Sequence, residues 1–327
     1  MVNRTTSTAT IDRIQVLGGG RVAASLSGDA LRDVSVPFGA TAAGATFNPG
    51  QAGFVMMDVT FKRKARNLPR RLSHRLSVTL DPEIPSNVRT YRAAPTRILT
   101  RPAIVVEPPL RGSNWVVGNG CCGELTSHRA GVLGIDGGLH AGERFAIDFV
   151  QLTGQGLLTD GPMNVLSNYP FFGDRVHSAT GGRVVDVVRN IPETPALSLP
   201  PNISAADSGG NQVTVRVGKG RFAFYAHLQP GSPRVKVGDR VRPGQVLGLL
   251  GNSGNSSAPH LHFQLMNGKT PLASDGVPYR FDRYGLQGRV SNFGEVFEGI
   301  PAQIAPRPTG PRRNSLSLNE EIVDFGG

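Results

Sequence analysis

The sequence predicts an all-β protein, and three observations lead to that prediction. Gly 42 and Pro 25 together make up 67 of the 327 residues, which favours short elements joined by turns over long helices. The apolar runs are short, rich in Val, Ile, Thr and Phe, and separated by turn residues at the spacing of a β-sandwich. Hydrophobic residues reach 39% without any apolar run of about 18, so we expect a soluble chain with a sizeable core and no transmembrane segment.

The length predicts two domains, because the chain is about twice a common domain length. Residues 1–106 carry runs such as ATIDRIQVL and HRLSVTL and predict an N-terminal β-sandwich of unknown role. The proline-rich EPPLRGSNW marks a join, and residues 107–300 form a second β domain with a long surface loop over 193–210. We expect residues 301–327 to be a C-terminal tail.

The formal net charge of +11 comes mostly from arginine and favours an anionic partner, such as nucleic acid, a membrane surface or an acidic cell-wall polymer. The single Trp115 and the lack of a concentrated basic helix speak against nucleic acid. The densest basic run is KRKARNLPRR, residues 62–71, for which a solvated loop is favoured over a polyanion contact.

The two cysteines, Cys121 and Cys122, are adjacent, and neighbouring residues rarely reach disulfide geometry. They also lack the spacing of a structural zinc site, so we expect two small packing residues. The N-terminal MVNRTTSTATIDRIQ has no apolar segment of a secretory signal. We therefore expect either a cytoplasmic protein or one whose signal has been cut off and replaced by Met.

Alternation in the run HLHFQL, residues 260–265, places His260, His262 and Gln264 on one face of a strand and the apolar residues on the other. Two imidazoles on one face can converge on a metal, or one can bind metal while the other serves a substrate. An HxH pair is common by chance. The tight polar loop GNSGNSSAP that leads into this strand strengthens the prediction of a site here.

The run RFAFYAHL, residues 221–228, predicts a second strand with a polar face. Alternation places Tyr225 and His227 on one face and points the apolar residues of the other face to the core, namely Phe222, Phe224, Ala226 and Leu228. In RFAIDFV, the apolar face leaves Asp148 opposite, among apolar neighbours. A carboxylate in such a place is costly unless it is paired, for example with Arg144, or binds a metal.

A further histidine is needed to complete a metal site, and His128 and His140 are the two nearby candidates. In a continuous strand over 139–150, His140 would lie eight residues from Asp148, roughly 26 Å away. The turn signal Asp136-Gly137-Gly138 predicts a hairpin that folds His128 back to within about two residues of Asp148. We therefore favour His128 over His140.

From about residue 115 to 284 the order of these elements resembles the lysostaphin-type (LytM-like) zinc metallopeptidases, most of which are peptidoglycan endopeptidases. The resemblance is carried by FGDRVHSATGGRVVDVV, GNQVTVRVGKGRFAFYAHLQPGS, VKVGDRVRPGQVLGLLGNSG and PHLHFQL, in the order of that family. It implies packed antiparallel sheets of the duplicated hybrid motif, or barrel-sandwich hybrid, with the metal in a groove between loops.

Carried over residue by residue, the resemblance implies that Asp148 and His262 bind the metal and that His227 and His260 act on the water or the oxyanion. The family's usual histidine four residues before the aspartate is replaced here by Arg144. A subset of the family has a longer spacing with an SHR-like segment, which Ser127-His128-Arg129 resembles. His128 is then the first metal ligand.

The resemblance implies one Zn²⁺ per chain and a metalloendopeptidase that hydrolyses peptide bonds of peptidoglycan cross-links or stem peptides. His260 would accept the water proton and pass it to the leaving amine, and His227, together with Tyr225, would stabilise the oxyanion. It also implies a secreted, periplasmic or cell-envelope location. The alternative is an inactive family member that binds the wall or activates another hydrolase, and Arg144 is its support.

Overall fold

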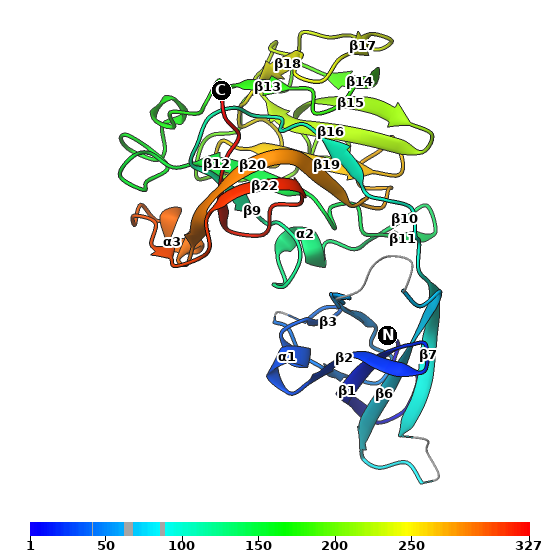
Figure 1. The fold of residues 1–327 in the computed structure, drawn as a ribbon. Coiled ribbons are helices and arrows are strands. Elements are labelled where there is room, and N and C mark those ends of the chain that lie inside the picture. Colours follow the sequence, from blue (N-terminus) through cyan, green and yellow to red (C-terminus); the bar gives the residue numbers. More distant parts are fainter. Residues whose placement is uncertain (41, 62–67, 86–88) are drawn as a thin grey trace. The chain divides into compact units, whose positions relative to one another are not determined.

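Figure 1 shows the computed structural model of the chain, which describes residues 1–40, 42–61, 68–85 and 89–327. The basic stretch 62–67 therefore lies outside the described residues. The chain divides into two compact units, Met1–Pro102 with Gly123–Leu125 and Ala103–Cys122 with Thr126–Gly327. Strands dominate both units, so the all-β fold class is confirmed.

The first unit is built on an antiparallel sheet. Its elements are β1 (Thr8–Gly18), β2 (Arg21–Ser27), α1 (Asp29–Arg32), β3 (Ser35–Pro37), β4 (Thr46–Phe47), β5 (Gly53–Val55), β6 (Arg71–Asp81) and β7 (Thr90–Arg97). The sheet has the order β2-β1-β6-β7 with β4 paired to β1, and β3 and β5 form a separate pair. Ile14 lies opposite Leu76 in register, and each is 3% exposed, so they form part of a small core. A full two-layer sandwich stays a prediction.

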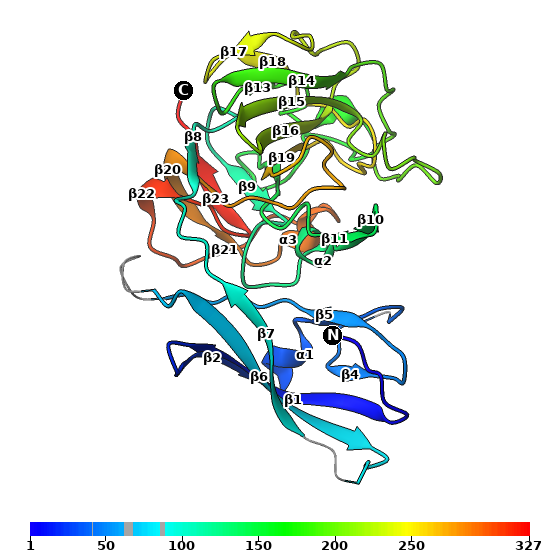
Figure 2. The same ribbon diagram turned by 90° about the vertical axis from the view of Figure 1, so that its right-hand side faces the viewer.

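The second unit contains one large sheet. Its elements are β8 (Ile104–Val106), β9 (Trp115–Gly118), α2 (Ser127–Ala130), β10 (Leu133–Ile135), β11 (Gly138–His140), β12 (Ile147–Gln151), η2 (Leu166–Asn168), β13 (Arg175–His177), β14 (Gly182–Val188), β15 (Asn211–Gly218), β16 (Arg221–Leu228), β17 (Arg240–Val241), β18 (Val246–Leu249), β19 (Leu261–Met266), β20 (Tyr279–Val290), α3 (Phe293–Val296), β21 (Ile304–Ala305), β22 (Gly310–Ser315) and β23 (Glu321–Asp324). The sheet runs β17-β14-β15-β16-β19-β12-β9-β23-β20-β21, and β8 and β22 also pair with β20 (Figure 2).

The middle of this sheet is buried on both faces. Apolar residues that point to one side of β9, β12, β16 and β19 form the main core, with Trp115, Phe149, Tyr225 and Phe263 fully buried. Strands covered on both faces carry long apolar runs, which is why RFAFYAHL and HLHFQLM read as strands in the sequence. The side chains on the other face of these strands form the candidate site described below.

The strand register sets one row of residues across the middle of the sheet. Asp148 on β12 lies opposite Gly118 on β9 and opposite His262 on β19, and His262 lies opposite Ala226 on β16. Directly opposed residues in antiparallel strands point to the same face, with Cβ atoms roughly 4.5–5.5 Å apart. The register alone therefore brings the carboxylate of Asp148 and the imidazole of His262 together.

The C-terminal residues, expected as a tail over 301–327, belong to the sheet. Strand β23 pairs with both β9 and β20, and Ile322 and Val323 are 5% and 0% exposed. Only the short apolar stretch EIVDF carries this strand, and the proline-rich segment before it conceals the signal in the sequence. Strand β8 likewise pairs with β20, which places residues 104–106 in the second unit.

This placement predicts the effect of a mutation in β23. Replacing the buried Ile322 by alanine is expected to lower the free energy of unfolding by about 2–5 kcal/mol, because it leaves a cavity in the sheet. The matched control is Ile304→Ala on β21, where the side chain is 52% exposed and the change is expected to stay within about 0.5 kcal/mol. Urea unfolding measures both; equal effects would argue that β23 is not packed as described.

Among the residues that the structure describes, no helix has the length and hydrophobicity needed to cross a membrane.

Candidate metal centre

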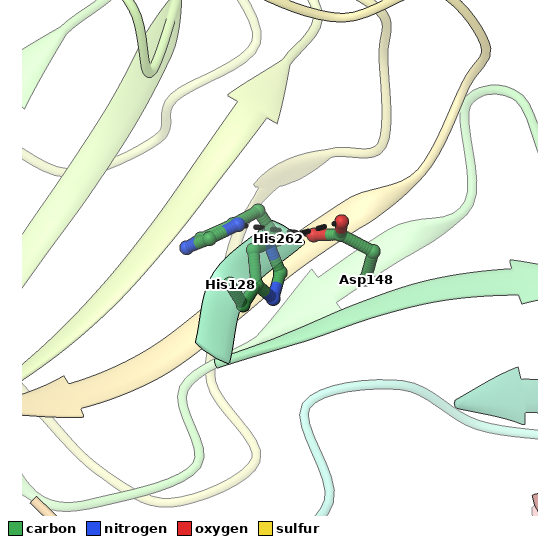
Figure 3. Close-up of side chains that lie close together, drawn as sticks. All are labelled: His128, Asp148 and His262. Carbon is green, nitrogen blue, oxygen red and sulfur yellow. Dashed lines mark hydrogen bonds and ion pairs between the residues drawn. The ribbon is translucent and has the colours of Figure 1, made fainter. Parts of the chain in front are cut away.

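Three side chains predicted from the sequence converge on one point (Figure 3). The Nε2 of His128 lies 3.2 Å from Oδ2 of Asp148, and the Nδ1 of His262 lies 3.0 Å from Oδ1 of the same carboxylate. All three donor atoms lie within 4.8 Å of one another. Two imidazoles and a carboxylate at this spacing form the donor set of a divalent metal ion, with room for further ligands.

His128 reaches this point from the one-turn helix α2. Thr126 caps the helix, and its hydroxyl accepts a hydrogen bond of 3.3 Å from the amide of Arg129. The predicted hairpin is present as β10 and β11, with Asp136 and Gly137 in the left-handed region at its turn. The alternative ligand His140 lies on β11, with its Nδ1 4.0 Å from Asp275.

Arg144 stands where the resembled family usually has a histidine, and it contacts residues next to the site. Its guanidinium donates a hydrogen bond of 3.7 Å to the sulfur of Cys121 and lies 5.1 Å from the centre of the Phe145 ring. The sulfur atoms of Cys121 and Cys122 lie against each other, and Cys121 is buried, as expected of a small packing residue. The two cysteines lie in the loop between β9 and α2, where side chains do not alternate as they do in a strand.

The hydrogen bonds around the three side chains hold them ready to bind a metal. The Nε2 of His262 donates to the amide oxygen of Gln264 at 2.8 Å, which leaves the lone pair of Nδ1 facing Asp148. The side-chain amide of Asn119 donates to Oδ2 of Asp148 at 2.9 Å and fixes the carboxylate. The residues present therefore fit a divalent metal ion.

The electrostatics of the site favour positive charge beside Asp148. Burial alone would raise the pKa of this carboxyl group, but the imidazoles of His128 and His260 hold the pKa well below its usual value. Burial lowers the pKa of His128, yet the Asp148 carboxylate outweighs it and raises the pKa to about 9. A buried carboxylate that attracts protons onto neighbouring imidazoles also attracts a metal cation, which competes with those protons.

His227 lies at the end of β16 with a left-handed backbone, at φ +62°. Its amide donates to the Gly209 carbonyl at 2.9 Å, and its ring Nδ1 donates to the Ser253 carbonyl at 2.8 Å. Burial, with the neighbouring imidazoles of His260 and His262, holds the pKa of His227 well below its usual value. The ring is therefore neutral, with Nε2 as its proton-accepting atom.

His260 lies beside His227, with the two ring centres 4.5 Å apart. Its Nδ1 donates to the Ala258 carbonyl at 2.9 Å and contacts the Ser256 hydroxyl at 3.2 Å, while Nε2 lies 3.4 Å from Asp148. Burial lowers the pKa of His260, but the Asp148 carboxylate outweighs burial and raises it. All five predicted site residues are thus brought together around one carboxylate.

Tyr225 does not join the site, which corrects the face assignment made for RFAFYAHL. Its ring is fully buried in the main core, and its hydroxyl accepts a hydrogen bond of 2.8 Å from the amide of Ala179. Phe224 and Ala226 face the site instead. His227 escapes the alternation because its positive φ turns the chain at the end of the strand, and this turn returns the imidazole to the site.

These side chains lie in a groove of about 740 Å³. The lining residues come from β9, α2, β12, the 193–210 loop, β16, the 252–258 loop, β19 and α3. The described lining residues include the five candidate site residues and no lysine or arginine. An extended peptide is the kind of molecule that such an open groove admits.

Comparisons with known proteins identify a peptidase domain in part of the chain. Residues 169–274 match the model of peptidase family M23, and this segment contains His227, His260 and His262. The chain contains a peptidase family M23 domain. His128 and Asp148 precede the matched segment of the M23 domain, and the structure brings them to its histidines.

Three curated proteins are similar to parts of this chain. Lysostaphin from Staphylococcus staphylolyticus is 33% identical over 127 residues, covering 32% of this chain and 26% of its own length. The glycyl-glycine endopeptidase ALE-1 from Staphylococcus capitis is 42% identical over 125 residues, covering 32% and 34%. The L-Ala--D-Glu endopeptidase of Bacillus subtilis is 32% identical over 90 residues, covering 24% and 28%.

The chain thus spans only about a quarter to a third of the length of these relatives. Among solved structures, the catalytic domain of lysostaphin from Staphylococcus simulans matches with 25% identity and a TM-score of 0.28. That match covers 50% of this chain and 88% of the lysostaphin domain.

Several supporting residues of the M23 domain were not found by sequence reasoning. The carboxylate of Glu193 accepts a 2.6 Å hydrogen bond from the amide of Asn252, which precedes Ser253 in the loop behind His227. The Asn252 side chain accepts from Ser256 at 2.6 Å, and Ser256 contacts His260. The GNSGNSSAP loop was the signal for these contacts, whereas Asn119 and Glu193 lie in segments without a recognisable pattern.

Glu193 predicts a pH effect on the stability of the M23 domain. Burial raises the pKa of Glu193 from 4.5 to about 7, and the hydrogen bond from Asn252 lowers it only in part. Between these values the folded chain keeps a proton that the unfolded chain has lost. The contribution of Glu193 to the free energy of unfolding is therefore fully present below pH 4.5 and is lost as pH rises through about 7.

The variant Glu193→Gln keeps an oxygen for the Asn252 amide and removes this titration. We expect its stability relative to the wild type to increase by on the order of 1 kcal/mol between about pH 5 and pH 8, a value reduced because the side chain is partly exposed. Urea unfolding of both proteins at the two pH values measures the change. If the stability difference between the wild type and Glu193→Gln is the same at pH 5 and pH 8, the raised pKa of Glu193 is refuted.

Proposed function

We propose that the chain is a zinc metalloendopeptidase that hydrolyses peptide bonds of peptidoglycan. The observation that carries this proposal is the convergence of His128, Asp148 and His262 beside the imidazoles of His227 and His260 in an open groove. Three protein ligands that leave further coordination positions open are typical of a catalytic rather than a structural zinc site. A relative named as a peptidoglycan DD-endopeptidase, ShyC of Vibrio cholerae, is 43% identical over 60 residues and supports peptidoglycan as the substrate.

In the proposed reaction, His128, Asp148 and His262 hold one zinc ion per chain. Bound there, zinc supplies a positive charge that polarises the peptide carbonyl and acidifies water. Asn119 keeps the Asp148 carboxylate in place, and Gln264 keeps His262 in the tautomer that presents Nδ1.

The proton transfers fall to His260 and His227. Because backbone carbonyls fix the Nδ1–H of both rings, each ring exchanges protons through Nε2. We assign to His260 the acceptance of the water proton and its delivery to the leaving amine. His227 is neutral and can stabilise an oxyanion by donation only after it has taken up a proton at Nε2.

An inactive scaffold was the alternative, supported by the replacement of the usual histidine by Arg144. The position of His128 beside Asp148 supplies the third donor, so the proposed site is complete without a histidine at 144. The positive net charge favours retention on anionic polymers of the cell wall, and we place the substrate in the cell envelope.

The test is hydrolysis of purified peptidoglycan by the full chain after zinc loading. We expect new α-amino groups to appear without new reducing sugar ends, and we expect a chelator to stop the reaction and zinc to restore it. His262→Ala is the matched control and is expected to release nothing. Product formation that is insensitive to chelation, or the absence of new amino groups, would contradict the proposal.

A further inference from the structure

Two aromatic side chains form one wall of the groove. Phe293 on α3 and Phe297 directly after it are both partly exposed and line the groove next to Val150. Their ring centres are 5.3 Å apart with the planes at 82°, an edge-to-face contact. Both lie outside residues 169–274, so the family match assigns nothing to them.

The segment that carries these rings is held rigidly. Val296, between the two phenylalanines, is fully buried and anchors α3 in the main core. The side chain of Asn292 donates to the Glu295 carboxylate at 3.0 Å and accepts from the amide of Gln303 at 2.7 Å. The two rings are therefore presented in a fixed position, which lowers the entropic cost of binding a ligand against them.

The aromatic wall lies beside the metal centre. A Cβ atom on Gly118 would lie 3.3 Å from the Phe293 ring and 2.9 Å from the backbone oxygen of Asp148. Glycine at this position therefore allows the ring to approach the strand that carries Asp148. Gly118 lies opposite Asp148 in the register of β9 and β12, so the Phe293 ring lies next to the strand position that carries the site carboxylate.

The rest of the groove lining is mixed in polarity. It includes the small polar residues Ser208, Asn255 and Ser256 and the apolar residues Leu199, Phe224 and Leu272. Glu143 is the acidic lining residue besides Asp148, and the described lining contains no lysine or arginine. The cationic surplus of the chain thus lies outside the groove, whose chemistry fits an uncharged peptide with one apolar side chain.

We propose that Phe293 and Phe297 form an apolar subsite for the substrate residue next to the cleaved bond, and that this subsite selects an aliphatic side chain over glycine. The inference rests on the proposed peptidase function and adds its side-chain preference. Removing the apolar contact area of a side chain from water favours binding, and glycine has none to bury. A pocket contact of this kind typically discriminates about 10-fold or more.

The experiment uses the zinc-loaded full chain and two series of quenched fluorescent peptides that carry glycine, alanine or leucine at one of the two positions flanking the cleaved bond. For one of these positions, we expect wild-type kcat/KM to be about 10-fold or more higher for leucine than for glycine. In Phe293→Ala and Phe297→Ala the preference should fall to within about threefold, mainly through a higher KM for the leucine peptide.

Two variants serve as controls. Phe293→Leu keeps an apolar side chain and is expected to retain the preference, which separates loss of the subsite from loss of the fold. Phe38→Ala removes an exposed phenylalanine of the first unit that also makes an edge-to-face contact, with Phe54 at 4.9 Å, and should leave the preference unchanged. Equal cleavage of glycine and leucine peptides by the wild type, or a preference that survives in both alanine variants, would overturn the subsite.

Binding of the same peptides, measured by fluorescence anisotropy, tests the apolar subsite separately from the proposed peptidase function. If the wild type cleaves none of the peptides, the proposed function fails for these substrates. Tighter binding of the leucine peptide that is lost in Phe293→Ala would still support the subsite. Equal binding of glycine and leucine peptides would refute it independently of any activity.

Discussion

Replacing Asp148 by alanine is expected to abolish peptidase activity and to reduce bound zinc from roughly one ion per chain to near none. The reason is that this carboxylate contacts His128, His260 and His262 at distances of 3.0–3.4 Å. Without it, three buried imidazoles face one another with no negative charge to hold a cation among them. Elemental analysis of the dialysed protein measures the zinc content, and peptide hydrolysis measures the activity.

The matched control is Asp275→Ala, which removes the carboxylate beside the alternative ligand His140. This variant is expected to keep both its zinc and its activity. If Asp148→Ala retains zinc and Asp275→Ala loses it, the metal centre lies at His140 instead.

The second large effect is expected from His260→Ala, which should lower kcat roughly 10²–10⁴-fold while leaving zinc content unchanged. The imidazole of His260 is held by Ser256 and Ala258 and is not one of the three grouped donors. Its loss removes a proton carrier and keeps the ligands. The measurements are kcat with a peptide substrate and elemental analysis of the same sample.

His74→Ala is the control, since His74 is a half-buried histidine on β6 of the first unit, and it should change neither value. If His260→Ala loses zinc together with activity, His260 is a metal ligand rather than a proton carrier. If activity is unchanged, the proposed role of His260 is excluded.

Alternation along the strands predicts much of the site. In β19 the pattern of HLHFQL gives the observed faces, with His262 and Gln264 hydrogen-bonded on one side and Phe263 in the core on the other. The pairing of β12 with β19 then opposes Asp148 and His262. Period-two patterning is reliable here because each strand has one face packed on the main core.

In β16 the side chains also alternate, but the predicted core face was wrong, because both faces are buried and apolar residues occupy each of them. The polarity of Tyr225 therefore does not tell which face of the strand it occupies, because its hydroxyl accepts a hydrogen bond from a backbone amide inside the core. The positive φ of His227 is a second reason why the predicted faces of β16 were wrong. Nothing in the local sequence announces a left-handed histidine, which depends on contacts with Gly209 and Ser253 from other loops.

Residues whose role depends on distant contacts are not visible in the sequence. Asn119 reaches Asp148 from a loop without a motif, and Glu193 reaches Asn252 across 59 positions of the chain. Phe293 and Phe297 have the pattern of ordinary core residues. The turn signal at Asp136-Gly137 predicts the observed hairpin of β10 and β11, and His128 lies 3.2 Å from Asp148.

Zinc content of His128→Ala beside His140→Ala tests the central claim most directly, because we propose His128 as the ligand that the usual spacing of the resembled family puts at position 144. The account predicts about one zinc per chain in the wild type and in His140→Ala, and near none in His128→Ala. Zinc retained in His128→Ala and lost in His140→Ala, or a wild type that takes up no zinc after reconstitution, would contradict it.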